Sequence, residues 1–206
     1  MILLKKGAEG DLFESVWNMR RCIVKVRKAK AYRNPSLDYR IRRGRTLRES
    51  DILCHIKRLG IRAPLVYFAD AIRCRLYLQY LEGPTVQSLS PEMLVPACSE
   101  IGQVAAILHR NSIVHGDLTT SNFIWGRDGV YSLDFGLAQR TAKSEDHATD
   151  LRVFKEILGS AHAESMTEAW AAFSAGYERM TDPATFRRIL KLVSVIESRG
   201  RYASVV

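Results

Sequence analysis

Apolar residues along the first eighty positions occur in short runs, which is the pattern expected of strands. Three of these runs are rich in β-branched or aromatic residues, and each therefore predicts a strand: Ile23–Val26, Leu65–Ala69 and Arg75–Leu81. A helix is expected from about Ser36 to Leu59, because Gly60 follows it and glycine commonly ends helices. The N-terminal part of the chain is therefore predicted to consist of strands interrupted by one helix.

The hydrophobic pattern changes to helical spacing after Glu82-Gly83-Pro84. Ser90-Pro91 is typical of a helix start, with serine as the cap and proline in the first turn. One face of this helix carries the apolar residues Leu94, Ala97, Ile101, Val104, Ala105 and Leu108. Further helices are expected over 144–158, 164–177 and 182–198, and a short strand over 130–133. These elements predict an α+β fold with a small strand-rich lobe at residues 1–82 and a helical lobe at residues 83–206.

The composition allows a buried core, since 47% of the 206 residues are hydrophobic and 26% are charged; this excludes wholesale disorder. No apolar run approaches the ~20 residues that a membrane helix requires, and the start MILLKKGAEG is too short for a signal peptide. We therefore expect a soluble, cytoplasmic protein with no membrane contact. The four cysteines form no Cys-x-x-Cys pair, which favours reduced, buried thiols over a zinc site or disulfides.

Charge indicates a polyanionic partner or ligand. The formal net charge is +9, and twelve Lys or Arg residues lie between Arg20 and Arg48 with only one acid, Asp38, among them. General solubility is the simpler explanation of a basic composition, but this local concentration favours nucleic acid, nucleotides or an acidic partner.

The strongest motif is His115-Gly116-Asp117, followed by Asn122 and later by Asp134-Phe135-Gly136. Protein kinases have a catalytic loop of this spacing, with a later Asp-Phe-Gly. Phosphoryl transfer needs a carboxylate near the attacking oxygen and oxygen ligands for magnesium at the phosphates. Any one of these residues alone is more often an ordinary turn residue. Together they predict a site for ATP and Mg²⁺ in which Asp117 is the catalytic base and Asn122 and Asp134 hold the metal.

Lys25 lies inside an apolar strand, where an unpaired ammonium would be costly. A kinase lysine of this kind holds the α- and β-phosphates and pairs with a helix glutamate. Glu49 is the first acid after Asp38 and lies on the basic helix. We therefore expect a Lys25–Glu49 pair, and the alternative is that both are ordinary surface residues.

Two further segments occupy the places of ATP-binding elements along the chain. Gly7-Ala8-Glu9-Gly10 precedes Lys25 where a phosphate-covering loop is expected, although it matches the usual glycine pattern poorly and would alone be an ordinary turn. The stretch from Leu78 to Leu81, including Gln79, is expected to be the hinge whose backbone groups contact adenine. This assignment rests on the order of the segments.

The sequence resembles the small atypical kinase family of the KEOPS complex (Bud-thirty-two), in its archaeal-type stand-alone form. The likeness spans nearly the whole chain, and its most diagnostic stretches are HGDLTTSN and the SRGR near the end. The resemblance implies a compact bilobal protein-kinase-like fold that works mainly as an ATPase. It also implies a Kae-type partner subunit that installs threonylcarbamoyl on the adenosine beside the tRNA anticodon. The kinase roles would fall on Lys25, Glu49, Asp117, Asn122 and Asp134.

The sequence departs from common patterns at several positions. Gln79 stands where an acidic hinge residue is frequent, and Tyr202 where another basic residue is frequent. Gly116 replaces the arginine of His-Arg-Asp, which disfavours switching by an activation-loop phosphate. No Ala-Pro-Glu triplet follows Asp134, so the peptide-docking segment of ordinary kinases is expected to be absent or very short. An ATPase completed by a partner suits these features.

Basic residues on the first helix and at the C-terminal end are candidates for contact with tRNA or a partner: Arg40, Arg42, Arg43, Arg45, Arg48, Arg199 and Arg201. A solvated helix face is the equally good alternative for the first group. The last two are expected to lie beyond the final helix. The residues His55, His109, His147 and His162 show no metal-ligand spacing and are expected to be structural.

Three functions remain open from the sequence. The first is a Mg²⁺-dependent ATPase and weak Ser/Thr kinase of a tRNA-modifying KEOPS assembly, together with its other subunits. The second is a free-standing Rio-like protein kinase, which the Asp-Phe-Gly sequence and the Gly7–Gly10 loop disfavour. The third is a nucleotide-bound scaffold for tRNA and proteins, which the complete set of catalytic residues disfavours.

Overall fold

The computed structural model describes residues 1–7 and 10–203, the last four of them as backbone only. The described chain forms two compact units, which are considered separately. The first contains Met1–Glu82 together with the short segment Asp134–Leu137, and the second contains Gly83–Leu133 and the chain from Ala138 onward. The segment Asp134–Leu137 belongs to the first unit, although a division of the sequence at residue 82 places it in the second.

The first unit is built on an antiparallel five-stranded sheet in the order β1-β2-β3-β5-β4. Its strands are β1 (Ile2–Lys5), β2 (Asp11–Trp17), β3 (Arg20–Val26), β4 (Val66–Asp70) and β5 (Arg75–Gln79). The three strands predicted from the hydrophobic runs are confirmed, whereas β1 and β2 were not predicted. All four residues of β1 are exposed, so this edge strand has no apolar face that a sequence pattern could reveal.

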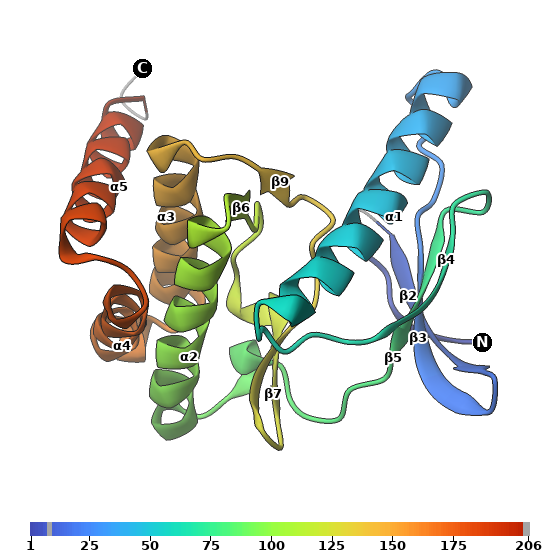
Figure 1. Ribbon diagram of the computed structural model, residues 1–206, viewed down its shortest axis with the longest axis horizontal. Coiled ribbons are helices and arrows are strands. Elements are labelled where there is room, and N and C mark those ends of the chain that lie inside the picture. Colours follow the sequence, from blue (N-terminus) through green and yellow to red (C-terminus); the bar gives the residue numbers. More distant parts are fainter. Residues whose placement is uncertain (8–9, 204–206) are drawn as a thin grey trace. The chain divides into compact units, whose positions relative to one another are not determined.

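Helix α1 (Pro35–Arg58) follows β3 in the same unit, as Figure 1 shows. Asn34 caps its start by accepting hydrogen bonds from the backbone N–H groups of Ser36 and Leu37. The helix ends before Gly60, whose φ of +82° is in the left-handed region that favours glycine. Its buried residues include Ile52, Leu53 and Ile56. The predicted helix is confirmed to within a residue or two.

The second unit contains the remaining helices and strands, which are α2 (Pro91–Arg110), β6 (Ile113–Val114), β7 (Phe123–Gly126), β8 (Gly129–Ser132), β9 (Gln139–Arg140), α3 (Ser144–Ala161), α4 (Met166–Arg179) and α5 (Pro183–Ala203). Strand β6 pairs with β9, and β7 pairs with β8. Short 3-10 turns cover Val86–Ser88, Thr120–Asn122 and Ala163–Ser165. The four predicted helices of this part are confirmed.

Close contact between α2 and α4 organises the core of the second unit. A Cβ atom on Gly102 would lie 2.0 Å from the carbonyl oxygen of Phe173, and one on Gly176 would lie 2.0 Å from that of Ser99. Glycine at both positions therefore lets the two helix backbones touch. Around this contact the aromatic side chains of Phe154, Phe173 and Tyr177 are fully buried, and helices α2–α5 gather together in Figure 1.

The C-terminal end differs from expectation. Helix α5 continues to Ala203, so Arg199 and Arg201 lie within the helix and not in a tail beyond it. The apolar stripe of this helix, which includes the buried residues Phe186, Ile189 and Val193, ends before these positions, so the hydrophobic pattern gave no sign of the last turn. In the part of the chain that the structure describes, no helix combines the length and the apolar character needed to span a membrane.

Candidate active site

A cluster of buried charges in the first unit joins β3, α1 and the segment after β8. Lys25 Nζ lies 2.7 Å from Glu49 Oε1 and 2.7 Å from Asp134 Oδ1. Lys25 and Glu49 are almost completely buried, whereas the Asp134 side chain is 39% exposed. The pair expected between Lys25 and Glu49 is therefore present, and the same ammonium also holds Asp134.

Arg27 also belongs to this cluster and was not predicted. Its guanidinium forms a very short ion pair with Glu49 Oε2, and its side chain is only 3% exposed. Burial raises the pKa of the Glu49 carboxyl above its ordinary value, while the charges of Lys25 and Arg27 oppose that rise. Arg27 directly follows β3. Because residues two apart in extended chain point to the same side, the spacing between Lys25 and Arg27 was the available signal.

The segment carrying Asp134 is held close to this cluster. The backbone N–H of Gly136 donates to Asp134 Oδ1 over 2.8 Å. A Cβ atom on Gly136 would lie 2.7 Å from Arg27 Nη2 and 3.0 Å from Asp134 Oδ1. The glycine of the Asp-Phe-Gly motif thus leaves room for the charged side chains, and this packing explains why residues 134–137 join the first unit.

The expected phosphate-covering loop is described only at its two glycines, since Ala8 and Glu9 lie outside the described residues. A Cβ atom on Gly10 would lie 2.7 Å from the carbonyl oxygen of Val26, and one on Gly7 would lie 2.6 Å from that of Gly10. Both glycines therefore permit a close approach of backbones beside the end of β3, the strand that carries Lys25.

Gln79, which is expected to belong to the hinge, makes two hydrogen bonds within the first unit. Its backbone N–H donates to the carbonyl of Leu65 over 2.8 Å, and its side-chain oxygen accepts from the Leu65 N–H over 3.2 Å. By contrast, the backbone of Leu81 makes no hydrogen bond to any residue in the described ranges. Of the two, Leu81 is the better placed to offer backbone groups to a ligand.

The second unit carries the other two predicted site residues on the loop after β6. Asn122 Nδ2 donates to the backbone carbonyl of Asp117 over 2.9 Å and to Asp117 Oδ2 over 2.8 Å. Because both bonds use the amide nitrogen, the amide oxygen Oδ1 remains available as an acceptor or metal ligand. Asp117 itself is exposed to solvent.

Asp150 on α3 anchors this loop and was not predicted. Its carboxylate accepts the backbone N–H of His115 over 2.6 Å and that of Gly116 over 2.9 Å. Gly116 has a φ of +77°, a conformation in which a side chain would be strained. Asp150 lies between the buried residues His147 and Leu151 on the helix. An acid on a helix face that is otherwise buried was the available sign that its carboxylate has a hydrogen-bond partner inside the protein.

A second hydrogen-bond layer supports Asp150. His109 Nε2 lies 3.2 Å from Asp150 Oδ2, and His109 Nδ1 lies 2.9 Å from the hydroxyl of Tyr177. Burial raises the pKa of Asp150, but the hydrogen bond and charge of His109, and those of His115, outweigh burial and hold the pKa below its ordinary value. The carboxylate therefore remains ionised and able to accept the loop N–H groups.

Replacing Asp150 by Asn is expected to remove part of the acid sensitivity of folding. The pKa of Asp150 is lowered in the folded state, so its contribution is present above the unfolded-state value of about 3.9 and is lost as the pH falls through the folded-state value. Free energies of unfolding in urea, measured from neutral to acidic pH, should fall more steeply for the unmodified protein than for Asp150→Asn. Exposed Asp128, replaced by Asn, is the control, and parallel curves for all three proteins would refute the assignment.

The basic residues of α1 and α5 differ in their contacts. Arg42 is held by Asp38 at 2.6 Å and by the backbone carbonyl of Arg27 at 3.3 Å, so its side chain stabilises the unit instead of facing a partner. The other predicted contact residues divide by exposure: Arg40, Arg43, Arg48 and Arg199 are exposed, Arg45 is half-buried, and nothing is described of the Arg201 side chain. Arg40 and Arg43 are three residues apart and so are neighbours on the helix surface.

The donor atoms suit a hard cation and phosphate groups. Asp134 offers a partly exposed carboxylate and Asn122 an unused amide oxygen, and oxygen ligands of this kind are those that Mg²⁺ prefers. Within the residues described, no group of three or more His, Cys, Asp or Glu side chains is arranged to hold a metal by itself.

Known proteins match almost the whole chain. The sequence model of the RIO domain matches residues 15–152. A Methanocaldococcus jannaschii protein named "Probable bifunctional tRNA threonylcarbamoyladenosine biosynthesis protein" is 38% identical over 97% of this chain, which spans only 37% of that protein. The Pyrococcus abyssi protein named "KEOPS complex subunit Bud32" is 34% identical over 98% of this chain and 96% of its own length.

Solved structures support the same kind of fold. One is the Rio2 kinase of Chaetomium thermophilum, solved as an ADP/Mg²⁺-phosphoaspartate complex. It matches with a TM-score of 0.65 at 10% identity, and the match covers 97% of this chain and 70% of the Rio2 chain. WaaP, solved with acyl carrier protein, has a TM-score of 0.57 at 14% identity over 98% of this chain and 88% of its own. The bilobal kinase-like α+β fold predicted from the sequence is confirmed. From the RIO domain match and the full-length likeness to Bud32, the chain belongs to the RIO domain family and, within it, to the group of the Bud32 proteins.

Proposed function

We propose that the protein is an ATP-hydrolysing atypical Ser/Thr kinase subunit of a KEOPS assembly that supports threonylcarbamoyladenosine modification of tRNA beside the anticodon. The observation that carries this proposal is the buried ion-pair cluster of Lys25, Glu49 and Asp134, accompanied by the hydrogen-bonded pair of Asp117 and Asn122. Kinases use residues of these four types, Lys, Glu, Asp and Asn, for phosphoryl transfer. The proposed setting is the cytoplasm.

The roles of the residues follow from their chemistry. Lys25, held by Glu49, would neutralise charge on the α- and β-phosphates of ATP. Asp134 and the Oδ1 atom of Asn122 would hold Mg²⁺, which when bound neutralises charge on the phosphate oxygens. Asp117 would accept the proton of the attacking hydroxyl, from water in hydrolysis or from a Ser or Thr side chain in phosphorylation. Asn122 orients the Asp117 carboxylate through its amide nitrogen.

ATP contacts outside the cluster are proposed at the glycine segment and the hinge. Gly7 to Gly10 would lie over the phosphates, and Leu81 would offer its backbone to adenine, with Gln79 beside it. The close approach of Gly10 to the end of β3 and the absence of a backbone hydrogen bond at Leu81 among the described residues support these placements.

The proposed partner is a Kae-type threonylcarbamoyltransferase subunit, together with other KEOPS subunits. The relative from Pyrococcus abyssi is named as a subunit of that complex, and in the Methanocaldococcus relative the matched region is part of a longer protein called bifunctional. The first name supports work within an assembly, and the second supports work beside another activity in tRNA threonylcarbamoyladenosine synthesis.

ATP turnover by the chain alone, with a Kae-type subunit, and with that subunit plus tRNA tests the proposed function. We expect Mg²⁺-dependent release of phosphate that rises when the partner is present. Strong phosphate transfer to a peptide by the chain alone, with no effect of the partner, would favour a free-standing Rio-like kinase. Binding of partner and tRNA without any turnover would favour a nucleotide-bound scaffold.

The exposed face of α1 gives a separate prediction for tRNA binding. The double change Arg40→Gln and Arg43→Gln should weaken binding and reduce the slope of log affinity against log salt by about one unit for each tRNA phosphate that is no longer neutralised. Filter binding of tRNA to the assembly at several salt concentrations measures this slope. Arg127→Gln with Arg179→Gln removes the same charge from exposed positions elsewhere, and an equal effect of both pairs would reject α1 as the contact surface.

A further inference from the structure

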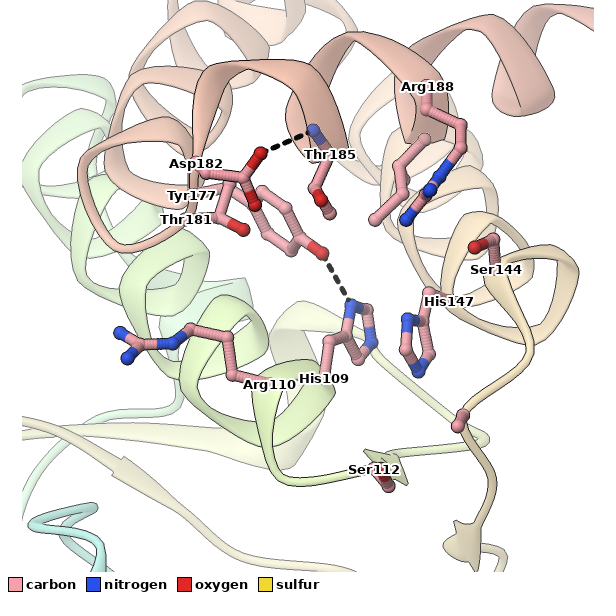
Figure 2. Close-up of a pocket in the computed structure, with 12 residues that line it drawn as sticks. His109, Arg110, Ser112, Ser144, His147, Tyr177, Thr181, Asp182, Thr185 and Arg188 are labelled. Carbon is pink, nitrogen blue, oxygen red and sulfur yellow. Dashed lines mark hydrogen bonds between the residues drawn. The ribbon is translucent and has the colours of Figure 1, made fainter.

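A pocket of about 240 Å³ lies within the second unit, apart from the residues of the proposed active site. Figure 2 shows it between the end of α2, the start of α3, the end of α4 and the start of α5. Ligand sites for drug-sized molecules are usually larger, from about 300 Å³ upward. The volume therefore suits a small ion or metabolite.

One arginine brings positive charge to this pocket. Arg188 on α5 is exposed, and among the described residues no acid or hydrogen-bond acceptor engages its guanidinium. Figure 2 shows its side chain extending toward Ser144 and His147. Arg110 at the end of α2 also lines the pocket, but its side chain extends away from His147 and Arg188 in Figure 2, and its guanidinium donates to the backbone carbonyl of Met180 over 3.1 Å. Arg188 is therefore the cation of this pocket that no carboxylate of the described chain neutralises.

His147 adds a buried polar atom to the pocket lining. The residue is only 8% exposed, and its Nε2 atom lies 3.2 Å from the backbone carbonyl of Thr141. That carbonyl can only accept, so Nε2 carries a hydrogen. The other ring nitrogen, Nδ1, has no hydrogen-bond partner among the residues described. In the neutral ring this atom is an acceptor, and it becomes a donor to a ligand in the pocket when the ring is protonated.

The remaining polar groups are compatible with an anion. Ser144 is the first residue of α3, which begins without a side-chain cap, so unpaired backbone N–H groups lie at this helix end. The carboxylate of Asp182 also lines the pocket, but it accepts the backbone N–H of Thr185 over 2.9 Å at the start of α5. Similarly, Asp146 in the first turn of α3 accepts from the hydroxyl of Thr141 over 2.7 Å. Both carboxylates have hydrogen-bond donors within the protein and keep their negative charge.

We propose that this pocket binds a small tetrahedral oxyanion, as free phosphate or as the phosphate group of a small phosphomonoester, between Arg188, His147 and the start of α3. The Arg188 guanidinium and the helix end supply charge and donors, and the volume allows only a small body beyond the oxyanion. The site goes beyond the proposed ATPase function and involves none of its proposed residues.

A chain of contacts connects the pocket to the loop that carries Asp117. The rings of His147 and His109 stack at a centroid distance of 4.4 Å. His109 in turn contacts Asp150, which holds the backbone N–H groups of His115 and Gly116. An oxyanion beside His147 therefore lies next to His109 and Asp150, the hydrogen-bonded residues that position the loop carrying Asp117.

Sulfate titration followed by NMR of the histidine side chains tests the site directly, because it needs no activity. We expect saturable shifts of the His147 and His109 signals that sodium chloride of equal ionic strength does not reproduce. Arg188→Gln should weaken sulfate binding about tenfold or more, the size expected for a charged hydrogen bond. Arg187→Gln removes the same charge from an adjacent exposed position that does not line the pocket and should leave the affinity unchanged.

The pH dependence of sulfate binding supplies an independent outcome. Burial and the neighbouring His109 lower the pKa of His147, and its other neighbours are Asp146 and Asp150 on α3, Tyr177 on α4 and Asp182 and Arg188 at the start of α5. A bound anion favours the imidazolium, so the pKa of His147 should rise on binding and sulfate should bind more tightly at about pH 6 than at about pH 8. Sulfate keeps its charge across this range, so the change belongs to the protein.

Orthophosphate and glycerol 3-phosphate distinguish the two sources of the oxyanion. Equal affinity supports free phosphate, and tighter binding of glycerol 3-phosphate supports a phosphomonoester; in either case Arg188→Gln must weaken binding. Shifts that chloride reproduces, or equal losses for Arg187→Gln and Arg188→Gln, would overturn the proposal. These results are separable from ATP turnover, which the proposed function predicts whether or not the pocket binds an anion.

Discussion

Replacing Asp117 by Asn lowers ATP turnover by about 10²–10⁴-fold, the usual contribution of a general base. The change removes the proton acceptor but keeps an oxygen that can accept the 2.8 Å hydrogen bond from Asn122 Nδ2, so the loop should retain its shape. The measurement is the steady-state rate of phosphate release by the chain with its partner, at saturating ATP and Mg²⁺.

Asp128→Asn is the matched control for this change. Asp128 is an exposed acid in the turn between β7 and β8 of the same unit, so its replacement alters charge but no proposed catalytic group. Its turnover should equal that of the unmodified protein. Equal rates for Asp117→Asn and the unmodified protein, with both proteins folded, would remove Asp117 from the mechanism.

Glu49→Gln should destabilise the first unit by about 3–5 kcal/mol, the usual cost of breaking a buried ion pair from one side. Glu49 is completely buried and binds two buried cations, Lys25 and Arg27. A neutral amide in its place leaves both positive charges without a full counter-charge and presents an N–H₂ group to donors. Urea unfolding followed by a probe of the first unit measures the loss.

The control for this experiment is Asp51→Asn, which removes an acid from the exposed face of the same helix. Surface substitutions of this kind usually change stability by no more than about 0.5 kcal/mol. If Glu49→Gln has an effect as small as the control, the buried cluster does not stabilise the unit as its contacts indicate.

Hydrophobic periodicity predicted the elements whose burial is one-sided. The apolar residues of α2 and β3 pack into the core, where Leu94, Ile101 and Val24 are almost inaccessible to solvent. Strand β1 escaped prediction because all of its residues are exposed, and β2 because most of its residues are only half-buried on both faces. The end of α5 was placed too early because its last turn carries no apolar stripe.

The candidate site could be predicted only where motif spacing marks it. Lys25 and Glu49 were paired from their order along the chain, and the structure contains that ion pair. Arg27 and Asp150 carry no motif of their own, because their roles come from burial against residues distant in sequence: Glu49 for the first, His109 and the loop for the second. Tertiary contacts of this kind leave only weak traces in a single sequence.

A crystal structure with Mg²⁺ and a non-hydrolysable ATP analogue tests the central claim most directly. We expect a metal at about 2.0–2.1 Å from a carboxylate oxygen of Asp134 and from Oδ1 of Asn122, with Lys25 on the phosphates and the Asp117 carboxylate facing the γ-phosphate. Nucleotide bound away from Lys25, or magnesium that neither Asp134 nor Asn122 holds, would contradict the claim.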